Sequence, residues 1–195
     1  YGLFGLMRLV GDLTLTKLFY RQCRILRRPY YIRNFGKIVF GKNLTTGVAL
    51  RIDVVKPEGL LVIGENVQLN DYCHIGVASY GEIGNGTLIA SKVFITDHQH
   101  GNISGSCNES SPLTLPISRP LSVKDVIIGE NVWIGENVTI LPGVNIGNGC
   151  IIGAGSVVTR NLPSNIIAAG GPAKRIKHYD CSMNKGVMGD FDAIN

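Results

Sequence analysis

Charged residues are scarce in this sequence: they make up 17% of its 195 residues, and it holds only one tryptophan and four histidines. Glycine is frequent, with 25 residues, and 45% of the chain is hydrophobic, which excludes a disordered protein. No run of about 18 or more uninterrupted apolar residues occurs, so a membrane-spanning helix is not expected. The length suits one domain with small appendages.

The cysteines are few, and their pattern matches neither of the common uses of the residue. Five are present, and they show neither CxxC spacing nor a disulfide framework: Cys23, Cys73, Cys107, Cys150 and Cys181. Free thiols are the simplest interpretation, and they are typical of a reducing compartment. We therefore expect a cytoplasmic protein.

Positive charge is concentrated at the beginning of the sequence. Residues 1–42 hold nine Lys and Arg against Asp12 alone, whereas the remainder carries a net charge of −3. This basic segment, residues 1–38, includes the apolar and interrupted stretch YGLFGLMRLVGDLTLTKLFY, which predicts a helix. The helix could lie on the inner face of a membrane, or it could pack on its own body or on a partner subunit. Its charge indicates an anionic neighbour at this end.

The same basic segment does not indicate a nucleic-acid partner. In RQCRILRRPYYIR, arginines alternate with Tyr30 and Tyr31, but no known binding motif accompanies them. Without a supporting fold, no nucleic acid is expected as a partner.

The body of the sequence repeats every six residues. Apolar residues recur with this period in two blocks, and a small or β-branched residue follows most of them by four positions. The apolar positions are Ile63, Leu69, Ile75, Ile83, Ile89 and Ile95 in the first block, and Ile128, Ile134, Ile140, Ile146, Ile152 and Val158 in the second. Neither a helix nor a plain strand has this period, whereas a short strand followed by a corner does.

Three such sides close a triangular coil of about 18 residues, and stacked coils bond to one another as parallel strands. The sequence therefore predicts an all-β parallel β-helix over residues 39–172, with the repeated apolar residues inside. Residues 101–124 lack the repeat and predict a long excursion loop, which in a compact domain is usually functional. GPAKRIKHYD cannot continue the repeat, and it predicts a short C-terminal helix within residues 173–195.

The excursion begins at ITDHQHG, where His98 and His100 stand next to Asp97. His98 follows Ile95 by three residues, a phase that elsewhere holds turn residues, so we expect it at a corner and pointing outward. An imidazole is suited to removing a proton from a hydroxyl near neutral pH. The alternative is a corner histidine that only bonds to backbone.

Four segments of this sequence resemble the hexapeptide-repeat acyltransferases, and most closely the O-acetyltransferases of bacterial lipopolysaccharide, capsule and exopolysaccharide synthesis. They are LNDYCHIG, LIASKVFITDHQHG, VIIGENVWIGENVTILPGVNIG and IIGAGSVVTRNLPSNIIAAGGPAKRIK. The resemblance implies a left-handed β-helix, a homotrimer, and acetyl-CoA bound between adjacent subunits without a metal. It also implies a saccharide acceptor whose hydroxyl is activated by one histidine.

By this resemblance, His98 matches the catalytic histidine. Asp97 could fix a histidine tautomer or cap the loop, and His100 could contact the acceptor or anchor the loop. Asn70 matches an acceptor-binding asparagine, although asparagine is also common in turns. His74, which lies near Asn70 in sequence, is expected to be structural.

The acetyl-CoA site also follows from the resemblance. Glu136 and Ala154, which the repeat places one coil apart, match backbone contacts to the thioester and pantetheine arm, with the Glu136 amide as a candidate oxyanion donor. Family positions near the nucleotide and its phosphates are matched by Thr159, Arg160, Lys174 and Lys177. Trp133 could wall the acyl pocket or pack in the trimer. Glu136 replaces a small residue of several relatives, and the two lysines replace arginines of some sugar acetyltransferases, so bidentate phosphate contacts are not assumed.

Three other functions share the predicted fold. A non-catalytic scaffold would need no corner histidine. A zinc carbonic anhydrase would need three converging histidines, which the spacing of the four present fits poorly. An acetyltransferase for serine, a free sugar or an antibiotic differs only in its acceptor, and the basic N-terminal segment favours an acceptor at the membrane surface.

Overall fold

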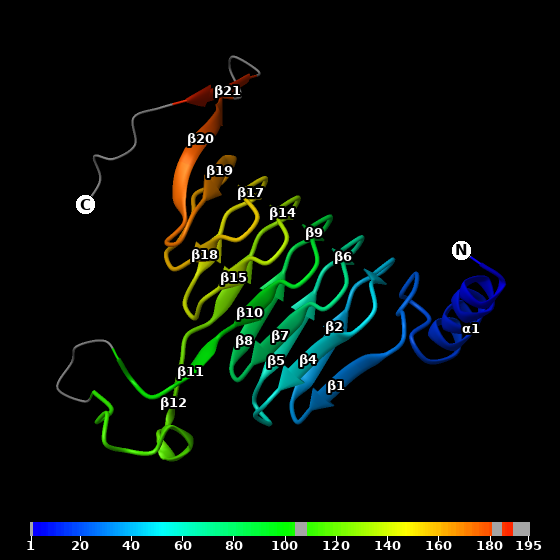
Figure 1. Cartoon of the computed structure of the whole chain (residues 1–195), viewed down its shortest axis with the longest axis horizontal. Helices are drawn as coiled ribbons and strands as arrows, with labels where there is room; N and C mark the ends of the chain where they lie inside the picture. Colours follow the sequence, from blue (N-terminus) through cyan, green and yellow to red (C-terminus); the bar gives the residue numbers. More distant parts are fainter. Residues whose placement is uncertain (1, 104–108, 181–184, 189–195) are drawn as a thin grey trace.

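The computed structural model describes residues 2–103, 109–180 and 185–188. One helix, α1 (Leu3–Phe19), lies at the end of a long solenoid of short strands (Figure 1). The strands stack along a single axis, with the N-terminal coils next to α1 and the C-terminal strands at the far end. This arrangement confirms the predicted parallel β-helix, and its left-handed winding stays a prediction from the family resemblance.

The solenoid has three faces, each of which is one sheet. Face 1 contains β1 (Tyr30–Asn34), β4 (Leu50–Val54), β7 (His74–Val77), β10 (Phe94–Thr96), β15 (Thr139–Ile140) and β18 (Val157–Val158). Face 2 contains β2 (Lys37–Phe40), β5 (Leu60–Ile63), β8 (Tyr80–Ile83), β13 (Val126–Ile128) and β16 (Asn145–Ile146). Face 3 contains β3 (Thr45–Thr46), β6 (Gln68–Leu69), β9 (Leu88–Ile89), β14 (Trp133–Ile134), β17 (Ile151–Ile152) and β19 (Ile166–Ala169), extended by β20 (Lys174–Asp180) and β21 (Lys185–Met188).

The chain visits face 1, face 2 and face 3 in turn and then returns to face 1 one coil further along. In the C-terminal half, where Thr139 pairs with Val157, each coil has the length of three six-residue repeats. Earlier coils are longer, because Arg51 pairs with His74 and His74 pairs with Phe94. The two-residue slip of the repeat near residue 80 is therefore one longer coil.

The core is the inside of the triangular prism. All twelve apolar positions of the six-residue repeat are buried, as the sequence predicts. The small residues four positions later are buried too, including Cys73, Thr87, Cys150 and Ser156, with Ser79 as a half-buried exception. Each fully buried Ile or Leu contributes roughly 1.5–3 kcal/mol by its removal from water.

Asparagine and glycine recur at the corners because the backbone there is left-handed. Asn66 and Asn131 have φ of 58° and 54°, and Gly149 has 67°. This region is costly for most side chains, and asparagine and glycine tolerate it best. The repeated GEN and GNG motifs are thus the corners that the sequence predicts.

The first strand lies ahead of the boundary expected at residue 39. β1 begins at Tyr30 and pairs in parallel with β4 over five residues. Its outward positions hold Tyr31 and Arg33, and this polar outer row hides the strand from a search for apolar repeats. The basic segment therefore divides into a helix and the first coil.

Helix α1 presents its polar side to the protein and its apolar side outward. Asp12 and Thr16 are its buried residues, and Asp12 pairs with Arg28 at 2.6 Å. The exposed residues of the helix are mostly large and apolar: Leu3, Phe4, Leu6, Met7, Val10, Leu13, Leu18 and Phe19. No helix in the described ranges has the length and apolar character of a membrane span.

The excursion contains more structure than the expected loop. β11 (His98–His100) pairs antiparallel with β12 (Leu121–Val123), and a short 3₁₀ helix, η1 (Pro116–Ser118), lies between them. The pairing closes the base of the excursion, which projects from the corner between faces 1 and 2 (Figure 1). This ladder fixes the direction in which His98 leaves face 1.

The predicted C-terminal helix is wrong. β20 turns back and pairs antiparallel with β19, and β21 pairs with β20. The last coil of a solenoid leaves a row of unpaired backbone groups, and a returning strand satisfies them. Residues 173–180 favour a helix by local propensity, but this pairing overrides it.

Candidate active site

The candidate active site begins where β10 ends, at Asp97 and His98. The Asp97 side chain is fully buried, and its carboxylate accepts hydrogen bonds from the backbone N–H groups of Ala78, at 2.8 and 2.9 Å, and Ser79, at 2.7 Å. One of its oxygens also lies 2.7 Å from Nδ1 of His98. Asp97 therefore anchors the corner and orients the imidazole at once, so the two alternatives from the sequence coexist.

The geometry sets the tautomer of His98. A carboxylate only accepts hydrogen bonds, so Nδ1 carries the hydrogen and Nε2 holds the lone pair. Among the described residues, Nε2 has no hydrogen-bond partner. The side chain is 18% exposed, so the ring is held by its surroundings while an approach remains open.

The absence of a side chain at Gly76 makes room for this imidazole. A β-carbon added to Gly76 would lie 3.3 Å from Cε1 of His98, which is a tight contact. Gly76 is on β7, and its partner in the next strand is Thr96, whose hydroxyl accepts a hydrogen bond from the His98 N–H at 3.2 Å. The ring therefore lies over the outer surface of face 1.

His100 is two residues further along β11, and its side chain is exposed. Its position in the ladder is opposite Leu121, whereas His98 is opposite Val123. None of the hydrogen bonds of the described residues joins the two histidines. A direct role for His100 stays a prediction.

Glu136 and Ala154 lie at a different corner, between faces 3 and 1. They stack in adjacent coils, because the N–H of Gly155 donates to the carbonyl of Glu136 at 2.8 Å. A β-carbon on Gly135 would lie only 2.6 Å from the Ala154 nitrogen, so this stack excludes side chains at Gly135. Within the described residues, the N–H groups of Glu136 and Ala154 donate no hydrogen bond. They are exposed amides in line along the axis.

The carboxylate of Glu136 is directed to Lys92, in the coil below, at 3.1 Å. Both side chains are exposed, so the pair contributes little to stability. Asn70 is at the same corner, two coils below Glu136, where its backbone N–H donates to Ile89 at 2.9 Å. Trp133 lies on face 3 with its side chain 51% exposed, outside the prism.

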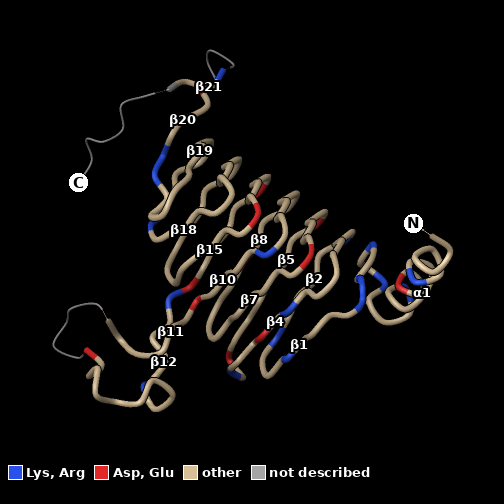
Figure 2. The backbone as a smooth tube through the Cα atoms, in the orientation of Figure 1, with Lys and Arg blue, Asp and Glu red and all other residues tan. Residues whose placement is uncertain are grey.

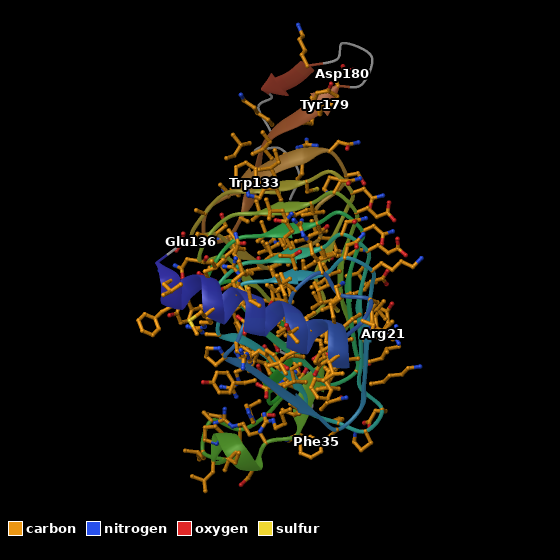
Figure 3. The ribbon with its side chains drawn as sticks, turned by 90° about the vertical axis from the view of Figure 1, so that its right-hand side faces the viewer. Arg21, Phe35, Trp133, Glu136, Tyr179 and Asp180 are labelled. Atoms are coloured by element: carbon orange, nitrogen blue, oxygen red, sulfur yellow. The ribbon has the colours of Figure 1, made fainter. Side chains whose placement is uncertain are left out.

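The structure therefore does not bring all the predicted residues together in one chain. Viewed along the solenoid, Glu136 and Trp133 lie on one side, and Phe35, which marks the corner between faces 1 and 2, lies at the bottom (Figure 3). His98 belongs to the second corner, as do Thr159 and Arg160 after β18. The width of face 1, about 13 Å for four residues, separates the two groups. Lys174 and Lys177 lie on β20 instead of a helix.

Sequence reasoning missed a polar cluster on the outer surface of face 1. Asp53 accepts from Nε of Arg51 at 2.6 Å and from Nε of Arg33 at 3.0 Å. Nε2 of His74 lies 2.9 Å from the same carboxylate. The register between β1, β4 and β7 would have revealed this cluster, but these coils do not have the regular length of three repeats.

The cluster perturbs the titration of its members. Burial works to raise the pKa of Asp53, but hydrogen bonds from Arg51 and His74, with the charges of Arg33 and Arg51, lower it below its usual value. Burial lowers the pKa of His74, against the effect of Asp53. His74 is therefore neutral at pH 7 and donates its Nε2 hydrogen to Asp53.

The described cysteines are inert by position. Cys23, Cys73 and Cys150 are free and buried. Burial raises the pKa of the Cys23 and Cys73 thiols to about 11, and it raises the pKa of Cys150 as well. Cys107 and Cys181 lie outside the described residues. Among the described residues, no group of three or more His, Cys, Asp or Glu is placed to hold a metal ion.

Comparison with known proteins places this fold and site in context. Residues 125–160 match the family model described as bacterial transferase hexapeptide (six repeats). The chain is 54% identical over 180 residues to an Escherichia coli K12 protein named "Putative lipopolysaccharide biosynthesis O-acetyl transferase WbbJ", covering 92% of this chain and 91% of that protein.

Solved structures share the architecture. A galactoside acetyltransferase in complex with coenzyme A is 26% identical, with a TM-score of 0.55, over 81% of this chain and 72% of that one. The N-acyltransferase AntD from Bacillus cereus, in complex with dTDP-4-amino-4,6-dideoxyglucose and coenzyme A, has a TM-score of 0.63 over 83% of both chains. At 22% identity, this second likeness shows the fold alone.

Proposed function

This chain belongs to the bacterial transferases built from hexapeptide repeats, and we propose that it moves an acetyl group from acetyl-CoA to a sugar hydroxyl of a bacterial surface polysaccharide or its precursor. The Escherichia coli relative, named for O-acetyl transfer in lipopolysaccharide biosynthesis, supports the acceptor class. The galactoside acetyltransferase, which contains coenzyme A, supports the donor.

The observation that carries the proposal is the Asp97–His98 pair. Its carboxylate holds Nδ1 at 2.7 Å and leaves the basic Nε2 directed away from all described hydrogen-bond partners. A general base in such a position accepts a proton from an alcohol, and it typically contributes about 10²–10⁴-fold to the rate. His98 is the proposed base.

The active site is proposed to form between two copies of the chain. His98 and the exposed amides of Glu136 and Ala154 lie at opposite edges of face 1, too far apart to meet at one thioester. In a closed ring of identical subunits, one edge of each copy faces the other edge of the next. A homotrimer therefore brings His98 of one subunit to Glu136 of the partner subunit.

The reaction then needs one proton transfer in each direction. Nε2 of His98 takes the hydroxyl proton as the sugar oxygen bonds to the thioester carbonyl carbon. The carbonyl oxygen becomes negative, and the Glu136 amide of the partner subunit donates a hydrogen bond to it. When the carbon–sulfur bond breaks, the leaving thiolate takes the proton from Nε2. The products are the acetyl ester and coenzyme A.

The remaining predicted residues would hold the donor. The Ala154 amide, one coil above Glu136, suits an extended pantetheine arm that runs along the solenoid axis. Arg160, Lys174 and Lys177 are cations near the C-terminal end of the solenoid, where they would meet the phosphates, and Thr159 is beside them. Trp133 would either flank the acyl group or pack against another subunit.

We also propose that α1 rests on the inner face of a membrane. Its outward side is apolar, and exposed Arg21 and Arg24 follow it directly. An apolar helix face bordered by cations suits an anionic lipid surface. α1 lies across the end of the solenoid, so the coils would stand on the membrane, with the acceptor site near a lipid-linked glycan (Figure 1).

The test compares surface glycans from cells that lack this protein and cells that carry it, using mass spectrometry. Wild-type protein should add an acetyl group to the glycan, and His98→Ala should lower the yield about 10²-fold or more while the trimer stays intact. Gln99→Ala is the matched control, because Gln99 is the next residue of β11 and makes only a 3.4 Å bond to Gly101. A His98→Ala variant with wild-type turnover would show that the base is another group.

A further inference from the structure

A cavity of about 630 Å³ lies on the outer surface of face 1, between the first coil and the site of His98. Six of its lining side chains are polar or aromatic: Tyr31, Arg33, Arg51, Asp53, Tyr72 and His74. They come from β1, β4 and the corner before β7, so the cavity spans three successive coils. Figure 2 shows the charged segments of β1 and β4 next to one another at this place.

The two arginines share one carboxylate and keep most of their donors. Each reaches Asp53 through Nε alone, and no hydrogen bond engages the terminal nitrogens of either guanidinium among the described residues. The side chains are 56% and 53% exposed. One carboxylate neutralises one of the two guanidinium groups, so the cavity keeps an excess positive charge.

The cavity is continuous with the surface under His98. His74 lines it, and Gly76, over which the His98 ring lies, is two residues further on the same side of β7. Asp53 is the register partner of Gly76, and Arg33 is the register partner of Asp53. Two strand spacings therefore separate Arg33 from the position under the imidazole, which is about 10 Å.

Given the proposed function, we propose that this cavity binds an anionic group of the acceptor, a phosphate or a carboxylate, while a hydroxyl of the same acceptor reaches His98. The terminal nitrogens of Arg33 and Arg51 form a fork suited to such oxygens. The rings of Tyr31 and Tyr72, 59% and 60% exposed, offer faces against which a sugar ring can pack. A distance of about 10 Å suits one sugar unit between the anion and the reacting hydroxyl.

Asp53 and His74 serve as positioning residues in this cavity. The carboxylate holds both arginines by their Nε atoms and turns their outer edges toward the opening. His74 fixes the carboxylate from below, and its ring lies against Phe94 with centroids 5.1 Å apart. The arginines are thus oriented before a ligand arrives, which lowers the entropy cost of binding.

The experiment is a calorimetric titration of the full chain with pyrophosphate, glucose 1-phosphate, glucuronate and uncharged methyl glucoside. We expect the anions to bind and methyl glucoside to bind far more weakly. Arg33→Gln and Arg51→Gln should each weaken the anions about tenfold or more, the size of one lost charge-assisted hydrogen bond. Arg21→Gln, which removes an exposed arginine on another side of the molecule, should change the affinity less than about twofold (Figure 3).

Preference among the probes identifies the source of the anion. Stronger binding of the phosphates indicates a phosphate-linked sugar, and stronger binding of glucuronate indicates an acidic sugar. The proposal is overturned if no anion binds, or if both arginine variants bind the anions like the wild type. It is also overturned if these variants weaken coenzyme A equally, since the arginines would then serve the donor.

The outcome is separable from that of the proposed function. His98→Ala should keep the anion affinity of the wild type, because His98 is beside the cavity and not in its lining. If that variant also keeps full acetyl transfer, the base is misassigned while the anion site stands. If the arginine variants leave anion binding unchanged but His98→Ala abolishes transfer, the base stands and the anion site is wrong.

Discussion

The Asp97 carboxylate combines two tasks at the scale of a single residue. Three short hydrogen bonds from Ala78 and Ser79 hold it beneath the corner, and its contact with Nδ1 orients His98. A buried carboxylate with this many donors is rigid, so the imidazole has one orientation. Rigid positioning of a base raises the rate only when a substrate is bound.

Replacement of Asp97 by Asn should separate orientation of His98 from donor binding. The amide can turn its NH₂ toward Nδ1, which favours the wrong tautomer and places the hydrogen on Nε2. We expect kcat to fall about tenfold to a hundredfold while KM for acetyl-CoA changes little. Steady-state kinetics measure both values, with a melting curve to show that the fold persists. An unchanged kcat would mean that Asp97 only anchors the corner.

Asp53 gives a prediction for the dependence of stability on pH. Its pKa is lowered overall, so its contribution to stability is present above the ordinary Asp value of about 3.9 and is lost as the pH falls through its native pKa. The lowered pKa of His74 acts in the same direction, because the unfolded chain binds a proton more readily below about pH 6.5.

Asp53→Asn should therefore destabilise the protein most near pH 7 and least below about pH 3.5. Urea unfolding of the wild type and the variant at both pH values measures the difference in the free energy of unfolding. A difference that is the same at both values would mean that the pairing of Asp53 contributes no stability that depends on protonation.

At this scale the sequence reveals part of the site. His98 stands out because the six-residue repeat ends there, and the resemblance to known acyltransferases assigns it a role. The shared carboxylate of Arg33, Arg51 and His74 is invisible, because it depends on pairing between coils that are longer than three repeats. An ion pair across such coils requires the register, which the repeat alone does not give.

At the scale of the structural element, the repeated apolar positions are the unit of stability. Each strand contributes one or two inward side chains, and each such side chain lies above its equivalent in the coil below. Ile134, for example, is fully buried, and it pairs with Ile89 on one side and Ile152 on the other. The loss of one member leaves a gap that the short strands cannot close.

Ile134→Ala should lower the free energy of unfolding by about 2–5 kcal/mol. The matched control is Leu113→Ala in the excursion, where the side chain is 94% exposed and the expected change is below about 0.5 kcal/mol. Urea denaturation compares the two variants with the wild type. Equal effects would contradict the assignment of the interior.

Helix α1 is the element whose function its local pattern least explains. Its buried residues are polar, and its exposed ones are apolar, which reverses the usual arrangement of a surface helix. The sequence predicts the helix but not which side faces the protein, because Asp12 becomes a buried residue only through its bond to Arg28. Tertiary pairing also decides the C-terminal strands, where local propensity favours a helix.

The double variant Leu6→Ser and Val10→Ser should lose membrane binding about tenfold or more, because both side chains lie on the outward surface of α1. Co-sedimentation with phosphatidylglycerol vesicles measures the bound fraction, and phosphatidylcholine vesicles test the role of charge. We expect the wild type to bind the anionic vesicles more strongly. If the wild type stays in the supernatant with both lipids, α1 has a different partner.

At the scale of the whole molecule, the solenoid distributes the catalytic groups over two edges. Face 1 lies between them, with His98 at one edge and the Glu136 and Ala154 amides at the other. The repeat predicts the prism and the stacking of Glu136 under Ala154. The relation of the edges depends on the order of the faces, and the assembly that joins them depends on contacts between copies.

Complementation between two inactive variants tests this account most directly. His98→Ala lacks the base, and Ala154→Phe blocks the donor edge, so each variant alone should be nearly inactive. Trimers assembled from an equal mixture should regain about one quarter of the wild-type acetyl transfer, because a quarter of the sites combine an intact His98 edge with an intact partner edge. If the mixture stays as inactive as its components, both edges act within one chain and the shared site is wrong.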